Sequence, residues 1–175
     1  MGMDFEASKV RILGIDPSLT GCGLVVLVDG ELKVATTIST PAKDARGKRL
    51  LEISNGVIHF WREHGRPDFV AMEDYSYGSP FNRESMGEVG GVIKLALYGL
   101  GVEPMLWPNQ SWKKAVLGKG NLKKEDLKLP IFKKFGVEID SMDQLEAFCV
   151  ARAEFEAQAN PALRPIPKKK RGVKK

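Results

Sequence analysis

Cysteine and histidine are scarce in this sequence, with two residues of each among 175. Cys22 and Cys149 lie inside apolar stretches, and neither a CxxC pair nor a mixed Cys/His cluster accompanies them. Structural zinc sites and disulfide frameworks need several such residues at short spacing. The sequence therefore indicates neither, and we expect both cysteines to be small core residues. His59 and His64 have no ligand residue near them, so we expect ordinary surface or packing roles for them.

Long apolar runs are also missing. No stretch approaches the roughly 20 apolar residues that span a bilayer. The first residues, MGMDFE, lack the basic-then-apolar order of a secretory signal. We therefore expect an intracellular protein without a membrane segment. With 43% hydrophobic residues, the chain is long enough for one well-buried domain and too short for two of full size.

Acidic residues are absent from the C-terminal end of the chain. The segment 161–175 holds seven Lys and Arg residues, and because the whole chain has a formal charge of only +5, residues 1–160 carry a net charge of −2. We predict a flexible segment over 1–8, a folded domain over 9–158 and a disordered basic tail over 159–175. Such a tail could bind phosphates nonspecifically or could merely keep the protein in solution.

A strand that ends in a carboxylate is the most informative feature that the sequence does contain. Residues 10–26, VRILGIDPSLTGCGLVV, predict a buried strand ending at Asp16, a Gly-rich turn and a second apolar strand. Asp29-Gly30 suits a tight turn into a third strand over 31–38, so these strands should form an antiparallel meander. An acid at the end of a buried strand is either satisfied by nearby N–H groups or holds a cation.

A second acid, Glu73, ends another short apolar strand over 68–73. A helix predicted over 47–64 precedes this strand, and the loop that follows it carries Tyr75 and Tyr77. These aromatic side chains could stack on unpaired bases, or they could cover the edge of the core. The sequence leaves both interpretations open.

Lysines gather in the second half of the chain. A helix over 84–100, in which Gly87, Gly90 and Gly91 permit close approach of another backbone, is followed by a strand over 102–107 and a further helix. We expect Lys113 and Lys114 to point outward from that helix. The basic residues from there to 128 are Lys113, Lys114, Lys119, Lys123, Lys124 and Lys128. They form a basic patch that suits phosphate contact, with an ordinary solvated face as the alternative.

The last predicted helix, over 139–155, begins with two acids. Asp140 and Asp143 are three residues apart, so in a first helical turn they would share one face. Asp140 could be the N-cap, but a cap needs one acid and leaves Asp143 unexplained. With Asp16 and Glu73 they form a set of four carboxylates, a donor set typical of Mg²⁺ or Mn²⁺. Two such ions about 4 Å apart can activate a water and stabilise the leaving oxygen in phosphodiester hydrolysis.

The order of these elements resembles the RNase H-like nucleases, and most closely the RuvC family of Holliday junction resolvases. The matching segments cover roughly residues 10–156 and are ILGIDPSLTGCGLVV, VAMEDYSYG, GEVGGVIKLALYGL, QSWKKAVLGKGNLKKED and DSMDQLEAF. The resemblance implies an α/β, RNase H-like fold with a central mixed five-stranded sheet flanked by helices. It implies a metal-dependent endodeoxyribonuclease of DNA recombination and repair that resolves four-way junctions by paired incisions leaving 5′-phosphates and 3′-hydroxyls, with other branched DNA as a second candidate substrate.

The resemblance also implies roles for particular residues. The metal ligands would be Asp16, Glu73, Asp140 and Asp143, holding two Mg²⁺ ions, or Mn²⁺ in their place, with Asp16 bridging both. Lys114 and Lys124, or their immediate neighbours, would act at the scissile phosphate or on the attacking water. Further DNA contacts would come from Tyr75, Tyr77, Lys113, Lys119 and Lys123.

The same resemblance implies a homodimer built around the helix over 84–100, which would place two active sites on opposing strands of the junction. The segment DPSLTGCG is two residues shorter than in cellular members and is similar to that of phage-encoded ones. We therefore expect the protein to work in the cytoplasm of a bacterium, encoded either by the cell or by a phage.

Two other classes of function share part of the pattern. Actin-like and sugar-kinase ATPases hold ATP phosphates with a hairpin similar to GIDPSLTGCG, but they need two domains and a second Gly-rich hairpin, which this chain lacks. A non-catalytic module that only binds branched DNA would not need four carboxylates. ATP hydrolysis without DNA cleavage would favour the first class, and binding without cleavage would favour the second.

Overall fold

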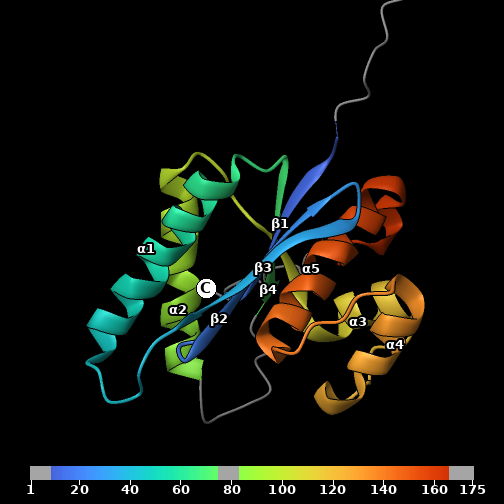
Figure 1. The fold of residues 1–175 in the computed structure, drawn as a ribbon. Coiled ribbons are helices and arrows are strands. Elements are labelled where there is room, and N and C mark those ends of the chain that lie inside the picture. Colours follow the sequence, from blue (N-terminus) through green and yellow to red (C-terminus); the bar gives the residue numbers. More distant parts are fainter. Residues whose placement is uncertain (1–8, 75–82, 166–175) are drawn as a thin grey trace, which may run out of the picture.

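A mixed five-stranded sheet forms the centre of the molecule (Figure 1). The computed structural model describes residues 9–74 and 83–165. The strands are β1 (Arg11–Asp16), β2 (Gly21–Val28), β3 (Glu31–Ser39), β4 (Phe69–Asp74) and β5 (Met105–Pro108). β1, β2 and β3 form the predicted antiparallel meander, whereas β4 pairs in parallel with both β1 and β5. The order β3-β2-β1-β4-β5 places β1 in the middle, so the predicted mixed sheet is confirmed.

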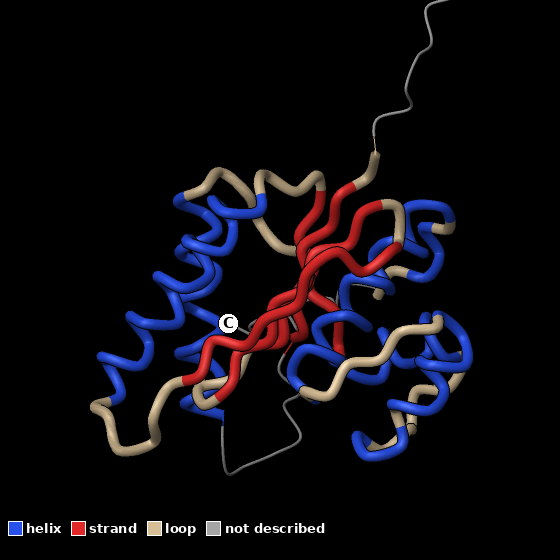
Figure 2. The backbone as a smooth tube through the Cα atoms, in the orientation of Figure 1, coloured by secondary structure: helices blue, strands red, loops and turns tan. Residues whose placement is uncertain are grey.

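Helices cover both faces of this sheet (Figures 1 and 2). One face carries α1 (Arg46–His64) and α2 (Arg83–Gly99). The other carries α3 (Asn109–Leu117), α4 (Lys128–Phe135) and α5 (Met142–Ala159), with a short 3₁₀ turn at Lys124–Asp126 before α4. No helix in the described part of the chain has the length and apolar character needed to cross a membrane.

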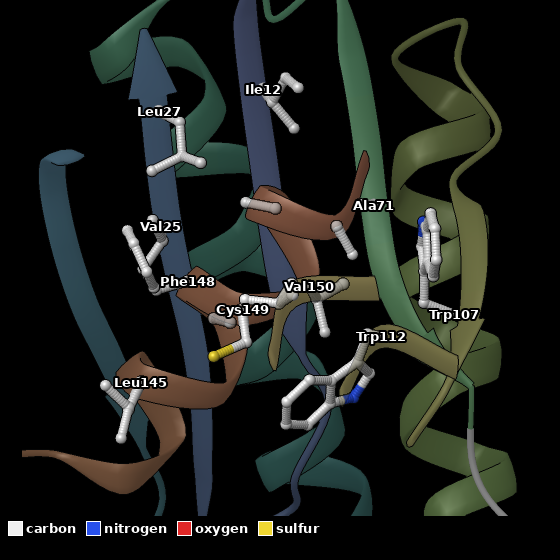
Figure 3. Packing of buried hydrophobic residues seen from close by; sticks show 14 of the residues in the cluster. Ile12, Val25, Leu27, Ala71, Trp107, Trp112, Leu145, Phe148, Cys149 and Val150 are labelled. Carbon is white, nitrogen blue, oxygen red and sulfur yellow. The ribbon is translucent and has the colours of Figure 1, made fainter. Parts of the chain in front are cut away.

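The alternation of side chains along β1 divides the core into two layers. Leu13 and Ile15 pack with α1 and α2, whereas Ile12 packs against α5 (Figure 3). Asp16, four residues after Ile12, therefore faces α5. Cys149 of α5 is buried in the same layer, as the sequence predicted. The strand thus delivers its terminal carboxylate to the helix rather than to solvent.

β4 places a second acid on the same face and at the same edge of the sheet. Ala71 packs in the α5 layer (Figure 3), and Glu73 follows two residues later on that face. In the parallel pairing, Ile15 of β1 lies opposite Met72 of β4. The next residues, Asp16 and Glu73, therefore leave neighbouring strands side by side.

Two glycines allow α5 to lie directly on the sheet. A Cβ atom on Gly14 would come within 2.6 Å of Ala151 Cβ, and one on Gly23 would collide with the carbonyl of Asp143. Gly23 is also the pairing partner of Asp16 in the β1–β2 ladder. The missing side chains therefore let the first turns of α5 approach Asp16.

We expect Gly14→Ala to lower the free energy of unfolding by about 1–3 kcal/mol, because the added methyl group has to push α5 away from the sheet. Urea denaturation followed by circular dichroism would measure the change. Gly47→Ala is the matched control: this exposed glycine of α1 has open space around its Cβ position, and the substitution should raise helix stability by up to about 1 kcal/mol. Equal denaturation midpoints for the two variants would contradict the close packing of α5.

The end of α5 is tied back to the core by a buried carboxylate. Glu154 is 1% exposed. Its Oε2 accepts from Trp107 Nε1 at 3.1 Å, and its Oε1 accepts from Arg164 Nη2 at 2.6 Å. Residues 159–165, assigned by the sequence to the basic tail, thus end the helix, form a 3₁₀ turn and pack on the domain. The remainder of that tail lies outside the described residues, as does the predicted N-terminal segment.

Candidate functional site

Asp16 lies within a group of four carboxylates where β1, β4 and α5 meet. This acidic cluster consists of Asp16, Glu73, Asp143 and Glu146. Asp16 is 8% exposed, and burial is the main cause that raises its pKa well above the ordinary value. The charges of the other three acids raise this pKa further, whereas Lys124 opposes them. Carboxylates that disfavour one another's ionisation form a place where a cation is stabilised.

Glu73 is held by two donors from α3. Asn109 Nδ2 donates to Oε1 at 3.0 Å, and Trp112 Nε1 donates to Oε2 at 3.1 Å. These residues are three apart, so one face of the helix presents both. Burial raises the pKa of Glu73 to about 7 despite the lowering effect of the two hydrogen bonds, and the charge of Glu146 adds to the rise. Both oxygens of Glu73 are thus oriented by neutral groups.

Glu146 is the member of the cluster that the sequence prediction missed. It is buried on α5, one helical turn after Asp143, and its carboxylate pairs with the Lys124 ammonium group. Lys124 Nζ also lies 3.9 Å from Asp143 Oδ1. Partial burial tends to lower the pKa of Lys124, but these acidic neighbours raise it above the ordinary value. The spacing of Asp143 and Glu146, i and i+3, is the signal that could have identified Glu146.

Asp140 precedes the last helix rather than lying in its first turn. The sequence predicts it in the first turn of the last helix, but α5 begins at Met142, with Ser141 as its N-cap. The Ser141 hydroxyl accepts a hydrogen bond from the backbone N–H of Gln144, which otherwise has no partner within the first turn of the helix. Asp140 therefore precedes the helix and is exposed, and the prediction that it shares a helical face with Asp143 is wrong.

The two adjacent lysines of α3 have opposite environments. Lys113 is 6% exposed, so the prediction that it points outward is wrong. Its ammonium group donates to the Leu122 carbonyl at 2.8 Å and lies 5.3 Å from the centre of the Trp112 ring. Its charge acts to lower the pKa of Glu73. Lys114 is exposed, so of this pair the structure brings Lys113 to the cluster.

The other residues predicted to bind DNA lie further out or beyond the described chain. Lys119 and Lys123 are exposed on the segment between α3 and the 3₁₀ turn. Tyr75 and Tyr77 lie outside the described residues. Lys124 is therefore the predicted DNA-binding lysine that the structure places directly against the carboxylates.

The oxygens of the acidic cluster suit a hard divalent cation in their chemistry. Four carboxylates without sulfur or imidazole ligands are the donors that Mg²⁺ and Mn²⁺ prefer. Within residues 9–74 and 83–165, however, no three His, Cys, Asp or Glu side chains are grouped closely enough to hold an ion as they stand. Burial and the charge of Glu146 raise the pKa values of both Asp16 and Glu73, and a divalent ion would oppose this rise. The chemistry of the donor set therefore fits such an ion.

The raised pKa of Glu73 predicts how stability depends on pH without metal. Because folding raises this pKa from 4.5 to about 7, the folded protein holds a proton that the unfolded chain releases between these values. The resulting stabilisation is complete below the lower value and is lost as the pH rises through the higher one. We expect the free energy of unfolding of the metal-free protein to fall by about 2–3 kcal/mol from pH 4.5 to 8.

Urea denaturation in the presence of a chelator would measure this dependence. Glu73→Gln should make the profile shallower, because the amide does not titrate while Asp16 still does. A wild-type stability that rises with pH over this range would contradict the assigned shift.

Comparison with known proteins shows to which family the chain belongs. A family model described as "Crossover junction endodeoxyribonuclease RuvC" matches residues 12–151. The chain belongs to the RuvC family. RuvC of Mycobacterium ulcerans is 35% identical over 121 residues, which cover 66% of this chain and 65% of that protein. RuvC of Mycobacterium tuberculosis is 34% identical over 121 residues, covering 66% and 64%. The chain thus spans just under two thirds of the length of these curated relatives.

Solved RuvC structures share the fold. Thermus thermophilus RuvC matches with a TM-score of 0.73 and 24% identity over 86% of this chain and 96% of that one. The same protein in complex with a Holliday junction substrate matches with a TM-score of 0.74 over the same shares. The RNase H-like fold expected from the sequence is thereby confirmed.

Proposed function

We propose that this protein is a metal-dependent endonuclease that cuts branched DNA, chiefly four-way junctions. The observation that carries the proposal is the acidic cluster formed by two strand ends and α5 in a chain of the RuvC family. The names of its relatives as crossover junction endodeoxyribonucleases, and the Holliday junction complex of one structural neighbour, support this substrate. The bacterial origin of these relatives supports a site of action in the cytoplasm of a bacterial or phage-infected cell.

We propose Asp16, Glu73, Asp143 and Glu146 as the metal ligands, with Glu146 in the place predicted for Asp140. Two Mg²⁺ ions, or Mn²⁺ in their place, would supply an activated water and a charge that stabilises the leaving oxygen of the phosphodiester. Asp16 is the member on which the charges of all the others act. We propose, as the resemblance implies, that Asp16 would help to hold both ions.

The other side chains of the site would orient the ligands and the DNA. Asn109 and Trp112 hold the carboxylate of Glu73 through both of its oxygens. Lys124 reaches the cluster from the surface and would meet the scissile phosphate, while Lys119 and Lys123 would meet phosphates further along the strand. This arrangement would restrict cleavage to the DNA backbone that lies over the place where β1, β4 and α5 meet.

Cleavage of defined DNA structures would test the proposed activity. Four-way, three-way, flap and linear duplexes, each labelled on every strand in turn, would be incubated with Mg²⁺ or with a chelator. We expect Mg²⁺-dependent paired incisions in the four-way junction, with nicks that DNA ligase can seal. Failure to cut any branched substrate would overturn the proposal. ATP hydrolysis would then favour a kinase-like protein, and binding alone would favour a non-catalytic module.

We further propose a homodimer through α2. Leu95 and Tyr98, which are 71% and 69% exposed, lie on the same side of this helix as Gly87 and Gly91. A Cβ atom on either glycine would meet nothing within 4 Å, so a second helix has room to approach. An exposed apolar stripe beside such space supports a contact between two copies, which paired incision requires.

Sedimentation equilibrium should give twice the chain mass of 19.3 kDa. The double variant Leu95→Glu/Tyr98→Glu should shift the protein to monomer, because it places charge in the apolar contact. Leu129→Glu is the matched control, since this leucine is 60% exposed on α4 across the sheet and should leave the mass unchanged. A wild-type monomer at micromolar concentration would exclude the dimer.

A further inference from the structure

The ammonium group of Lys124 already lies where a cation is needed. It pairs with the carboxylate of Glu146, lies 3.9 Å from Asp143 Oδ1, and its charge acts on Asp16 as well. The Lys124 side chain is 49% exposed, whereas that of Glu146 is 8% exposed. Lys124 therefore reaches inward from the surface and neutralises a buried acid. Without this partner, the buried charge of Glu146 would destabilise the fold.

The backbone that carries Lys124 is fastened on both sides. Two residues before it, the Leu122 carbonyl accepts from the buried Lys113 Nζ at 2.8 Å, which ties the segment to α3. Four residues after it, Lys128 Nζ donates to the Asp140 carbonyl at 2.8 Å, which ties the start of α4 to the approach of α5. These two hydrogen bonds hold the backbone of Lys124 beside the acidic cluster.

We propose that Lys124 is a tethered counter-ion, which balances the acidic cluster in the metal-free protein and is displaced from Glu146 when a divalent metal binds. The proposal rests on the proposed function, because it concerns the same four carboxylates. One ammonium group compensates one negative charge, whereas a divalent ion brings two charges and direct bonds to oxygen. The displaced ammonium group, still held close by its backbone, becomes available to the phosphate of the DNA. Metal binding thereby prepares the site for substrate.

Metal affinity without DNA distinguishes this role from a structural one. The six-line electron paramagnetic resonance signal of free Mn²⁺ would be titrated with wild-type protein, Lys124→Met and Lys123→Met. If Lys124 competes with metal, Lys124→Met should tighten Mn²⁺ binding on the order of tenfold, a usual size for coupling between two ligands. Lys123→Met removes a neighbouring exposed charge that salt screens and should change the affinity by less than about twofold. Weaker or unchanged binding in Lys124→Met would overturn the proposal.

A second measurement uses the wild-type protein and so does not depend on the folding of a variant. Acetylation by an N-hydroxysuccinimide ester would be followed at each lysine by mass spectrometry, with and without Mg²⁺. We expect Mg²⁺ to raise the acetylation rate of Lys124 several-fold, because the amine leaves its ion pair, and to leave that of Lys123 unchanged. Equal rates for Lys124 in both conditions would overturn the proposal.

The outcomes separate this inference from the proposed function. If wild-type protein fails to bind Mn²⁺, or if Asp16→Asn binds it equally well, the proposed metal site itself is wrong. If wild-type binding depends on Asp16 while Lys124→Met does not tighten it, only the counter-ion role is wrong.

Discussion

Asp16→Asn should abolish DNA cleavage, lowering the single-turnover rate on a four-way junction by about 10³-fold or more. Asp16 is the acid on which the charges of Glu73, Asp143 and Glu146 all act. The amide keeps the shape of the side chain but loses the charge that a divalent cation needs. Quenched-flow cleavage of a labelled junction at saturating Mg²⁺ would measure the rate.

The same substitution should not weaken the fold. Asp16 is buried among like charges, so its removal relieves repulsion, and at neutral pH the metal-free variant should be at least as stable as wild type. Junction binding in gel-shift experiments should also persist. A variant that cuts at the wild-type rate would refute a catalytic role for Asp16, whereas an unfolded variant would contradict the electrostatic assignment.

Glu146→Gln and Asp140→Asn should differ sharply in activity, although each removes one carboxylate near the start of α5. Glu146 is buried and its charge acts on both Asp16 and Glu73, so we expect its amide variant to lose at least about 10²-fold in cleavage rate. Asp140 is exposed and lies before the helix, so Asp140→Asn should stay within about threefold of wild type, as ordinary surface substitutions do.

Both variants would be compared on one labelled junction over a range of Mg²⁺ concentrations. Glu146→Gln should also need more Mg²⁺ for half-maximal rate, whereas Asp140→Asn should not. The reverse order of activities would restore Asp140 as the fourth ligand and remove Glu146 from the site.

The strands and their acids could be predicted because each rule involved is local. A buried apolar run that ends in a carboxylate is visible at Asp16 and again at Glu73, and the turn residues between the first strands set the meander. The parallel pairing of β1 with β4 then brings both acids to one edge, as the resemblance implied. Together with Asp143, three of the four carboxylates of the cluster were therefore predicted from the sequence.

Glu146 was missed because α5 has no polar face along its middle. All residues from 145 to 151 are buried, including Glu146, so no apolar stripe shows which side of the helix faces the strands, and the i, i+3 spacing from Asp143 is the remaining signal. A buried glutamate is rare enough that Glu146 is naturally assigned to solvent. Asp140 and Ser141 are both good N-caps, and local propensity cannot decide between them.

The lysines of α3 show a related limit. Lys113 and Lys114 are identical in type and adjacent, so their polarity predicts that both side chains are exposed. Burial of Lys113 depends on the Trp112 ring beside it and on a carbonyl supplied from Leu122, nine residues later. Such a partner becomes visible only when the segment after α3 has been placed in space.

The contact of Gly14 and Gly23 with α5 has a consequence for how this protein can evolve. One pair of acids is carried by the strands and the other by the helix, and the distance between the pairs is set by backbone touching backbone. A single methyl group at either glycine would move the two pairs apart without altering any charged residue. Gly14 and Gly23, which carry no side chain, are therefore among the positions that tolerate substitution least.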